Sequence, residues 1–193
     1  MSRFYPPDAY GELTEGISEI LITAEEIEQR VMEMGQAISR DYESCNPLLI
    51  GVLNGVVPFM AALLPAITIP VEVDFMAISK YGPERDGAVR LEKDLSRSIT
   101  GRHVLFVEDV IDTGLTLNYL IRNLKARQPA SLKVCTLFNK CRRRLIDLPS
   151  AYVGFDLPDL FVVGYGLDYR ERYRNLPFVG LLKPEVFQPN GSE

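Results

Sequence analysis

One stretch of the sequence, residues 103–117 (HVLFVEDVIDTGLTL), limits the folds open to this chain more than any other. The apolar run over residues 103–107 predicts a strand, and two adjacent acids, Glu108 and Asp109, follow it directly. After two more apolar residues, the string DTGLT (112–116) leads into a helical pattern. In an open α/β sheet, ligands bind beyond the carboxyl ends of the strands. We therefore expect this strand, loop and helix to carry a binding site.

Helix and strand patterns alternate along the rest of the chain. Thr23 and Glu26 form a capping-box pattern that predicts a helix over about residues 24–40. The continuous apolar run 48–53 is typical of a strand covered on both faces, as in a parallel sheet between helices. Further helices are expected over about 58–65 and 115–126, and further strands over about 71–79, 132–138, 152–155, 161–165 and 178–182. This order predicts an open, mostly parallel α/β sheet flanked by helices, within one domain over residues 1–193.

Composition excludes several other classes of protein. The chain has 193 residues, of which 47% are hydrophobic and 24% charged, so it can bury a core. A formal net charge of −5 gives no overall field that would attract nucleic acid or an anionic membrane, and neither partner is expected. The longest apolar run, 56–67, contains two prolines and is shorter than the ~20 residues of a spanning helix. Three cysteines without a CxxC pair and a first segment without a signal pattern predict a cytoplasmic protein.

The residue types after the strand fit a phosphorylated sugar. N–H groups at a helix N-terminus, the hydroxyls of Thr113 and Thr116, and the close approach allowed by Gly114 can together hold a phosphate. Acids beside a phosphate would repel it unless they served other groups. Glu108 and Asp109 can accept hydrogen bonds from a vicinal diol such as that of ribose.

The alternative is that these residues have only a structural role. Asp112 and Thr113 would then cap the helix, and the two preceding acids would be solvated, which is the more common situation for a lone Asp-Thr-Gly. The complete string, placed directly after a buried strand, is more specific and favours a ligand site.

At this point the sequence resembles the type I phosphoribosyltransferases, and within them the hypoxanthine-guanine branch. The supporting segments are LIGVLNGVVPFMAALL (49–64), VDFMAISKYG (73–82), RLEKDLSRSITGRHVLFVEDVIDTGLTL (90–117) and VGFDLPDLFVVGYGLDYRERYRNLPFVGLLKPEVF (153–187). The resemblance covers about 20–187 and implies a twisted sheet, a small hood formed by the terminal segments, and a flexible lid loop over about 80–93. It implies transfer of phosphoribosyl from 5-phosphoribosyl 1-diphosphate to N9 of hypoxanthine or guanine, with Mg²⁺ as cofactor and diphosphate released.

The resemblance also implies roles for the acidic string. Glu108 and Asp109 would bind the ribose hydroxyls, and residues 112–116 would surround the 5′-phosphate. That phosphate set consists of Asp112, Thr113, Gly114, Leu115 and Thr116. Asp112 would also face purine N7 as the general acid/base, a contribution typically worth ~10²–10⁴ in rate.

Purine contacts are implied for residues later in the chain. Lys140 would donate to the 6-oxo group, Phe161 would stack on the ring, and Val162 would touch it through its backbone. Asp168 is expected beside the purine and, with Glu108 and Asp109, in the magnesium set. Without the resemblance, Lys140 would be assigned to a solvated basic run and Phe161 to the core.

The diphosphate contacts are implied for a turn and an arginine. Leu53-Asn54-Gly55 lies where the family keeps a diphosphate-binding turn, often with a cis peptide bond, and Arg174 matches the diphosphate-binding arginine. On charge pattern alone, Arg174 would be one solvated charge among several.

The sequence departs from the family pattern at three positions. Cys141 replaces the usual proline after Lys140, Asn54 stands where some relatives have lysine, and Lys80 stands where many have serine before the lid residue Tyr81. The last two departures suggest that a diphosphate contact has moved from the turn to the lid.

Two alternatives on the same fold remain open: a xanthine-preferring transferase, and a non-catalytic regulator that senses the diphosphate sugar. A dinucleotide oxidoreductase and a P-loop enzyme are excluded, since neither G-x-G-x-x-G nor G-x-x-x-x-G-K-[ST] occurs. The resemblance implies a homodimer or homotetramer, with residues 56–64 and the segments near Lys140 as the expected interface.

Overall fold

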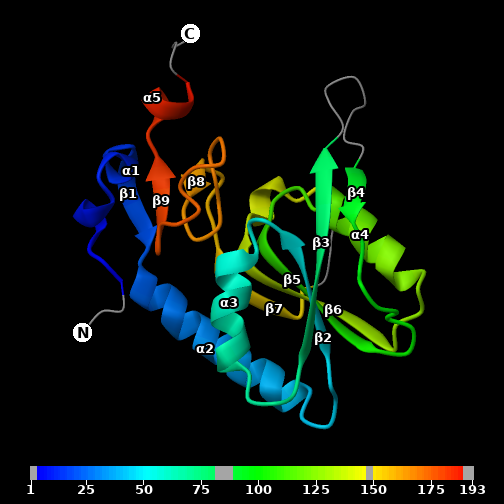
Figure 1. The fold of residues 1–193 in the computed structure, drawn as a ribbon. Helices are drawn as coiled ribbons and strands as arrows, with labels where there is room; N and C mark the ends of the chain where they lie inside the picture. The colour runs from blue at the N-terminus through cyan, green and yellow to red at the C-terminus, as the bar shows by residue number, and fades with distance from the viewer. Residues whose placement is uncertain (1–3, 81–88, 147–149, 189–193) are drawn as a thin grey trace.

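The computed structural model describes residues 4–80, 89–146 and 150–188. In these ranges the main sheet has the strand order β4-β3-β2-β5-β6-β7, with every neighbouring pair parallel except β3 and β4 (Figure 1). The strands are β2 (Leu48–Leu53), β3 (Glu72–Lys80), β4 (Val89–Lys93), β5 (His103–Ile111), β6 (Ser131–Asn139) and β7 (Tyr152–Asp156). The predicted open, mostly parallel sheet is confirmed.

Helices cover both faces of this sheet. Because successive side chains of a strand point to opposite faces, Leu49 and Leu105 pack with α2 (Ala24–Asp41) and α3 (Val57–Ala66). Ile50 and Phe106 pack on the other face with α4 (Leu115–Lys125). The capping box at the start of α2 is present. Within the described ranges, none of the helices is both long and apolar enough to cross a membrane.

The terminal segments form the predicted hood beside the main sheet (Figure 1). Its strands are antiparallel in the order β1-β9-β8, with β1 at Ile17–Ile22, β8 at Val162–Val163 and β9 at Val179–Leu182. The short helices η1 (Pro7–Tyr10), α1 (Glu12–Glu15) and α5 (Pro184–Phe187) flank them, and η2 (Cys141–Arg143) follows β6. The hood has a small core of its own around Tyr173 and Phe178. It therefore holds residues 159–174 as a separate wall beside the sheet.

Strand β5 is longer than the sequence predicted, and this corrects the placement of the acids. Its pairing with β2 ends at Gly51 and Val107, whereas its pairing with β6 continues to Ile111. Glu108 and Asp109 therefore lie in the strand and not in a loop after it, because β6 supplies hydrogen bonds on one side up to the end.

Two other expected boundaries were wrong. Residues 89–93 of the expected lid loop form β4, an edge strand paired with β3. Lys80 is the last residue of β3, and Tyr81 lies outside the described residues. The strand expected over 161–165 is limited to β8, because the two residues that follow it, Gly164 and Tyr165, have positive φ values of 102° and 48°.

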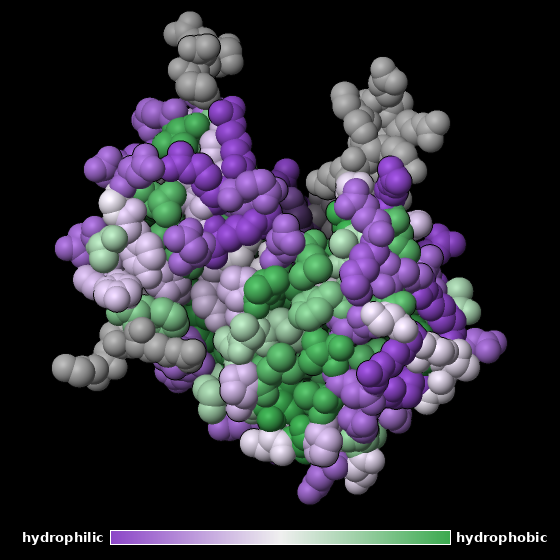
Figure 2. All heavy atoms as spheres, in the orientation of Figure 1, coloured by the Kyte–Doolittle hydropathy of each residue, from purple (hydrophilic) through white to green (hydrophobic). Residues whose placement is uncertain are grey.

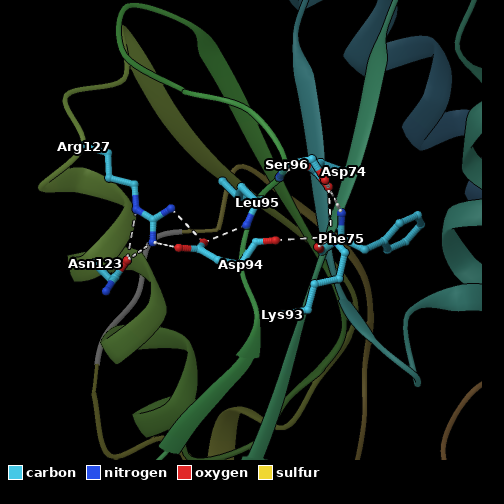
Figure 3. A network of polar contacts seen from close by, with 8 residues as sticks. All are labelled: Asp74, Phe75, Lys93, Asp94, Leu95, Ser96, Asn123 and Arg127. Atoms are coloured by element: carbon cyan, nitrogen blue, oxygen red, sulfur yellow. Dashed lines mark hydrogen bonds and ion pairs between the residues drawn. The ribbon is translucent and has the colours of Figure 1, made fainter.

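A polar network anchors the edge strand β4 (Figure 3). Lys93 at its end lies 3.3 Å from the Asp74 carboxylate of β3, and the next residue, Asp94, accepts two hydrogen bonds from Arg127 at 2.8 and 3.0 Å. Arg127 also donates to Asn123 of α4. The network therefore joins β3, the end of β4 and the end of α4.

The strand order places a topological switch between β2 and β5. From β2 the chain continues to β3 on one side, whereas β5 lies on the other side and continues to β6. Helical crossovers therefore leave a crevice at the carboxyl ends of β2 and β5, which is where ligands bind in folds of this kind.

The close packing of α2 on α3 generates a stability prediction. A Cβ on Gly35 would lie 2.5 Å from Ala66 Cβ and 2.6 Å from the Ala66 carbonyl oxygen. Overpacking costs about 1–3 kcal/mol and better helix propensity returns up to ~1, so Gly35→Ala should lower the free energy of unfolding by about 1–2 kcal/mol. Urea unfolding measures this. Gln36→Ala, on the exposed face, should change it by less than about 0.5 kcal/mol, and a Gly35→Ala protein as stable as the parent would contradict the packing argument.

Candidate functional site

A cavity of about 560 Å³ opens at the carboxyl end of β5, between the main sheet and the hood. It brings together residues that the sequence singled out at widely separated positions: Asp109, Asp112, Lys140, Phe161, Val162, Asp168 and Arg174. The remaining lining residues are Val110, Arg143, Asp159, Leu160 and Leu167. Glu108, residues 53–55 and residues 113–116 do not line it.

Asp109 lies against the turn that follows β2. A Cβ added to Gly55 would overlap the Oδ2 of Asp109, so only glycine permits this approach. The Leu53–Asn54 peptide bond in this turn is cis, as the resemblance suggested. The other carboxylate oxygen, Oδ1, accepts a hydrogen bond from Val110 N at 2.8 Å. The turn at 53–55 therefore reaches the site through Asp109.

Burial perturbs both acids of β5. It raises the pKa of Glu108 well above its ordinary value, and the neighbouring Asp109 charge raises it further. It also raises the pKa of Asp109, against hydrogen bonds from the backbone and the positive charge of Arg174. Glu108 Oε2 is buried and accepts no hydrogen bond from any described residue. Asp109 lines the cavity, whereas the preceding residue of the strand, Glu108, does not.

The loop after β5 is fixed by local geometry. Gly114 has a φ of 82°, the left-handed conformation that favours glycine, and α4 begins at the next residue. Thr113 Oγ1 accepts from Leu115 N at 3.4 Å. The residues expected to bind phosphate thus run from the cavity-lining Asp112 through the N-cap Gly114 into the first turn of α4.

Lys140 follows β6 and is half-buried, so it does not belong to a solvated basic run. Its Nζ donates to the Leu160 carbonyl at 2.9 Å. Burial lowers the pKa of Lys140, the charges of Asp112 and Asp159 raise it, and that of Arg143 lowers it. The ammonium group is therefore held at the cavity between the sheet and the hood.

Phe161 is a wall of the cavity and not a core residue. Phe161 is 40% exposed. Its ring stacks on the ring of Phe187, with centroids 4.9 Å apart, and meets the ring of Tyr169 edge-on. Val162, buried in β8, pairs with Leu181 of β9. The hood sheet thus fixes the backbone next to an accessible aromatic ring.

Asp168 and Arg174 contact each other. Arg174 Nη2 lies 2.9 Å from Asp168 Oδ1 and 3.0 Å from Glu171 Oε2, and Nη1 donates to the Gly166 carbonyl. Asp168 Oδ2 accepts from Glu171 N. The residues expected to bind metal and diphosphate are therefore adjacent.

The carboxylates of the cavity suit a magnesium ion in their chemistry. Mg²⁺ binds through one or two carboxylates and substrate phosphates, and two aspartates, Asp109 and Asp168, line the cavity. Among the residues that the structure describes, no three acidic, histidine or cysteine side chains are grouped closely enough to hold a metal by themselves.

Sequence reasoning missed Arg143 and Asp159. Arg143 is one of three consecutive arginines, so charge pattern could not show which of them turns into the cavity. Asp159 precedes Phe161 in the segment DLPDLF, where its charge alone gave no direction.

Comparisons with known proteins agree with this geometry. A family profile described as "Phosphoribosyl transferase domain" matches residues 18–170. The hypoxanthine-guanine phosphoribosyltransferase of Bacillus subtilis (strain 168) is 48% identical over 174 residues, which are 89% of this chain and 97% of that protein. A crystal structure of a Staphylococcus aureus hypoxanthine phosphoribosyltransferase has a TM-score of 0.88 at 42% identity, covering 92% of this chain and 98% of that one. A structure of a mutant hypoxanthine phosphoribosyltransferase from Trypanosoma cruzi, described as a ternary substrates complex, has a TM-score of 0.86 at 40% identity. The match covers 90% of this chain and 99% of that one.

The raised pKa of Glu108 predicts how stability depends on pH. The folded protein keeps the Glu108 proton to higher pH than the unfolded chain does, so the contribution of Glu108 to stability falls as pH rises from about 4.5 through the raised value. Glu108→Gln cannot lose this contribution, so it should become more stable relative to wild type as pH increases. The gain should be about 1.4 kcal/mol for each pH unit by which the pKa of Glu108 in the folded protein exceeds that in the unfolded chain.

Urea unfolding between pH 4.5 and 8, in buffer with EDTA, measures the difference. Glu28→Gln, on the exposed face of α2, is the control for a general charge effect. A stability of Glu108→Gln relative to wild type that stays constant or falls as pH rises would refute the assignment.

Proposed function

We infer that this chain, which belongs to the phosphoribosyl transferase domain family, is a purine salvage enzyme of the hypoxanthine-guanine phosphoribosyltransferase type. It transfers the phosphoribosyl group of 5-phosphoribosyl 1-diphosphate to a 6-oxopurine. The observation that carries this conclusion is the meeting of Asp109, Asp112, Lys140 and Phe161 in one cavity at the switch point of the sheet.

The purine is proposed to bind against the hood wall. An accessible aromatic ring offers a stacking surface, and Phe161 provides it. Lys140 would donate to the 6-oxo group, and because an ammonium group cannot accept a hydrogen bond, a 6-amino purine would be disfavoured. Hypoxanthine and guanine both carry the 6-oxo group, whereas adenine does not.

Asp112 is proposed to act on the purine itself. Transfer passes through an oxocarbenium-like ribosyl, so the incoming base must become nucleophilic at N9 as the bond to diphosphate breaks. The Asp112 carboxylate would take the N7 proton and raise the electron density of the ring. Its place between Lys140 and the start of α4 supports this role, because the purine and the 5′-phosphate would meet there.

The sugar phosphate is proposed to lie along the end of β5. Asp109 would accept hydrogen bonds from the ribose diol, and the N–H groups of residues 113–116 at the start of α4 would bind the 5′-phosphate. The role of Glu108 with the diol stays a prediction, since its side chain does not line the cavity.

Arg174 and the turn at 53–55 are proposed to bind the diphosphate. The planar guanidinium suits a bidentate contact with phosphate oxygens. Mg²⁺, when bound, would neutralise the charge that develops on the leaving diphosphate. Asp168 and Asp109 are the proposed carboxylates for it. The place of Glu108 in the magnesium set and the roles of Lys80 and Tyr81 at the lid stay predictions.

Self-association is proposed through α3. Figure 2 shows apolar residues gathered over the part of the surface where Figure 1 draws α3. Val57 on α3 and Met32 on α2 are each 46% exposed, and an extensive exposed apolar area marks an interaction surface. This supports the expected homodimer or homotetramer, which stays a prediction.

Two other expectations also stay predictions, namely the single domain and the cytoplasmic location.

The direct test is a spectrophotometric transfer assay with the diphosphate sugar. Hypoxanthine and guanine should be converted to their nucleotides in the presence of magnesium, adenine should not, and EDTA should stop the reaction. The relatives are named transferases, and no observation favours a regulator or a preference for xanthine. A protein inert toward every 6-oxopurine would overturn the proposed function.

In the same assay, Asp112→Asn should lower kcat by about 10²–10⁴, because general acid–base help is worth that much, with a smaller effect on KM for the diphosphate sugar. Asp8→Asn, which removes an exposed carboxylate of η1, is the matched control and should behave as wild type. Near-normal turnover by Asp112→Asn would contradict its role.

A further inference from the structure

Arg143 joins two carboxylates on different walls of the cavity. Its Nη1 lies 3.1 Å from Asp112 Oδ2, and its Nε lies 3.3 Å from Asp159 Oδ1. Asp112 precedes α4 on the sheet side, whereas Asp159 belongs to the hood segment, two residues before Phe161. One guanidinium therefore spans the space between the residue proposed to move the proton and the wall proposed to bind the purine.

The main chain fixes the turn that carries Arg143. Lys140 N donates to the Ile111 carbonyl at 2.9 Å, and Leu145 N donates to the Thr113 carbonyl at 3.0 Å. These hydrogen bonds fall on both sides of Asp112 in the sequence. The position of Arg143 relative to Asp112 is thus set by the backbone, and does not depend on the ion pair alone.

The oxygen that Arg143 holds is the one that can meet a ligand. Asp112 Oδ1 is buried and has no hydrogen-bond partner among the described residues, while the side chain as a whole is 43% exposed through its other atoms. Oδ2, paired with Arg143, is therefore the accessible oxygen. A carboxylate oxygen can accept more than one hydrogen bond, so Oδ2 can still receive a proton donor from a purine.

The neighbouring arginines do not share this position. Arg144 Nη2 donates to Asn139 Oδ1 at the end of β6. Arg142 is exposed and forms no ion pair with a described residue. The contact with Asp112 and Asp159 is therefore specific to Arg143, and Arg142 offers a matched control with the same charge.

We propose that Arg143 is a positioning residue for phosphoribosyl transfer, which holds Asp112 Oδ2 at a fixed distance from the hood wall at 159–161. This inference rests on the proposed function of Asp112. Displacing a reacting group by about 1 Å can reduce a rate 10²-fold, so a bridge of this kind acts on turnover more than on binding.

The solvent exposure of the Arg143 ion pairs distinguishes a positioning role for Arg143 from a role in stabilising the fold. The side chains of Arg143, Asp112 and Asp159 are 47%, 43% and 53% exposed. Ion pairs as exposed as these typically contribute little to stability. Loss of Arg143 should therefore leave the melting temperature nearly unchanged, whereas it should reduce kcat.

The test compares the steady-state kinetics and thermal unfolding of variants of the full chain. Arg143→Gln should lower kcat about tenfold or more, with KM for the diphosphate sugar within about twofold of wild type. Arg143→Lys keeps the charge without the planar fork and should lose most of the same activity. Arg142→Gln should match wild type.

Asp159→Asn tests whether the two contacts act as one bridge. It should lower kcat in the same direction, and the double variant with Arg143→Gln should be no slower than Arg143→Gln alone, because both changes break the same connection.

Four results would overturn the inference. They are unchanged kcat in Arg143→Gln, full activity in Arg143→Lys, additive losses in the double variant, and a raised KM for the diphosphate sugar with normal kcat. The last would make Arg143 a phosphate contact. Absence of transfer by the wild-type protein would instead overturn the proposed function, and the inference with it.

Discussion

The site depends on the point where β2 and β5 separate. Their pairing stops at Gly51 and Val107, yet β5 continues beside β6 to Ile111. Asp109 is thereby carried past the end of β2 and meets the turn at Gly55, where any side chain would overlap the carboxylate. Because the strand order also reverses between β2 and β5, the separation coincides with the crevice that open α/β sheets use for ligands. The cavity, the start of α4 and the hood wall are all arranged around this opening.

The charges of the cavity show how a chain with a net charge of −5 can bind a polyanion. Each cation has a partner close by: Lys140 donates to a carbonyl, Arg143 pairs with two acids, and Arg174 pairs with Asp168. Binding of substrate would exchange these partners, so it would not begin from isolated buried charges, which are costly. Electrostatic recognition is therefore local, because negative charges elsewhere on the chain are largely screened beyond about 8–10 Å.

The sequence predicted the sheet and the acidic part of the cavity from local signals, namely apolar runs, a capping box and the acidic string. The hood and the cavity residues Lys140, Phe161 and Arg174 were predicted only from the resemblance to a known family, because their local patterns are typical of solvated charges and core residues. It did not predict the length of β5, since two acids usually end a buried strand and only pairing with the distant β6 keeps them in it. It missed β4, whose charged residues pair with β3 and are held by Asp74 and Arg127. The sequence could not show which of the three consecutive arginines points into the cavity. The direction of the Arg143 side chain depends on a turn whose main chain hydrogen-bonds to Ile111 and Thr113, on both sides of Asp112.

We propose that one opening of the protein holds both the ribosyl phosphate and the purine. A crystal structure of the chain with inosine 5′-monophosphate tests it most directly. The phosphate should lie on the N–H groups of residues 113–116 and the ring over Phe161. The 6-oxo group should lie about 3 Å from Lys140 Nζ, and N7 should face Asp112. A nucleotide bound elsewhere, or turned so that Lys140 meets the ribose, would contradict it.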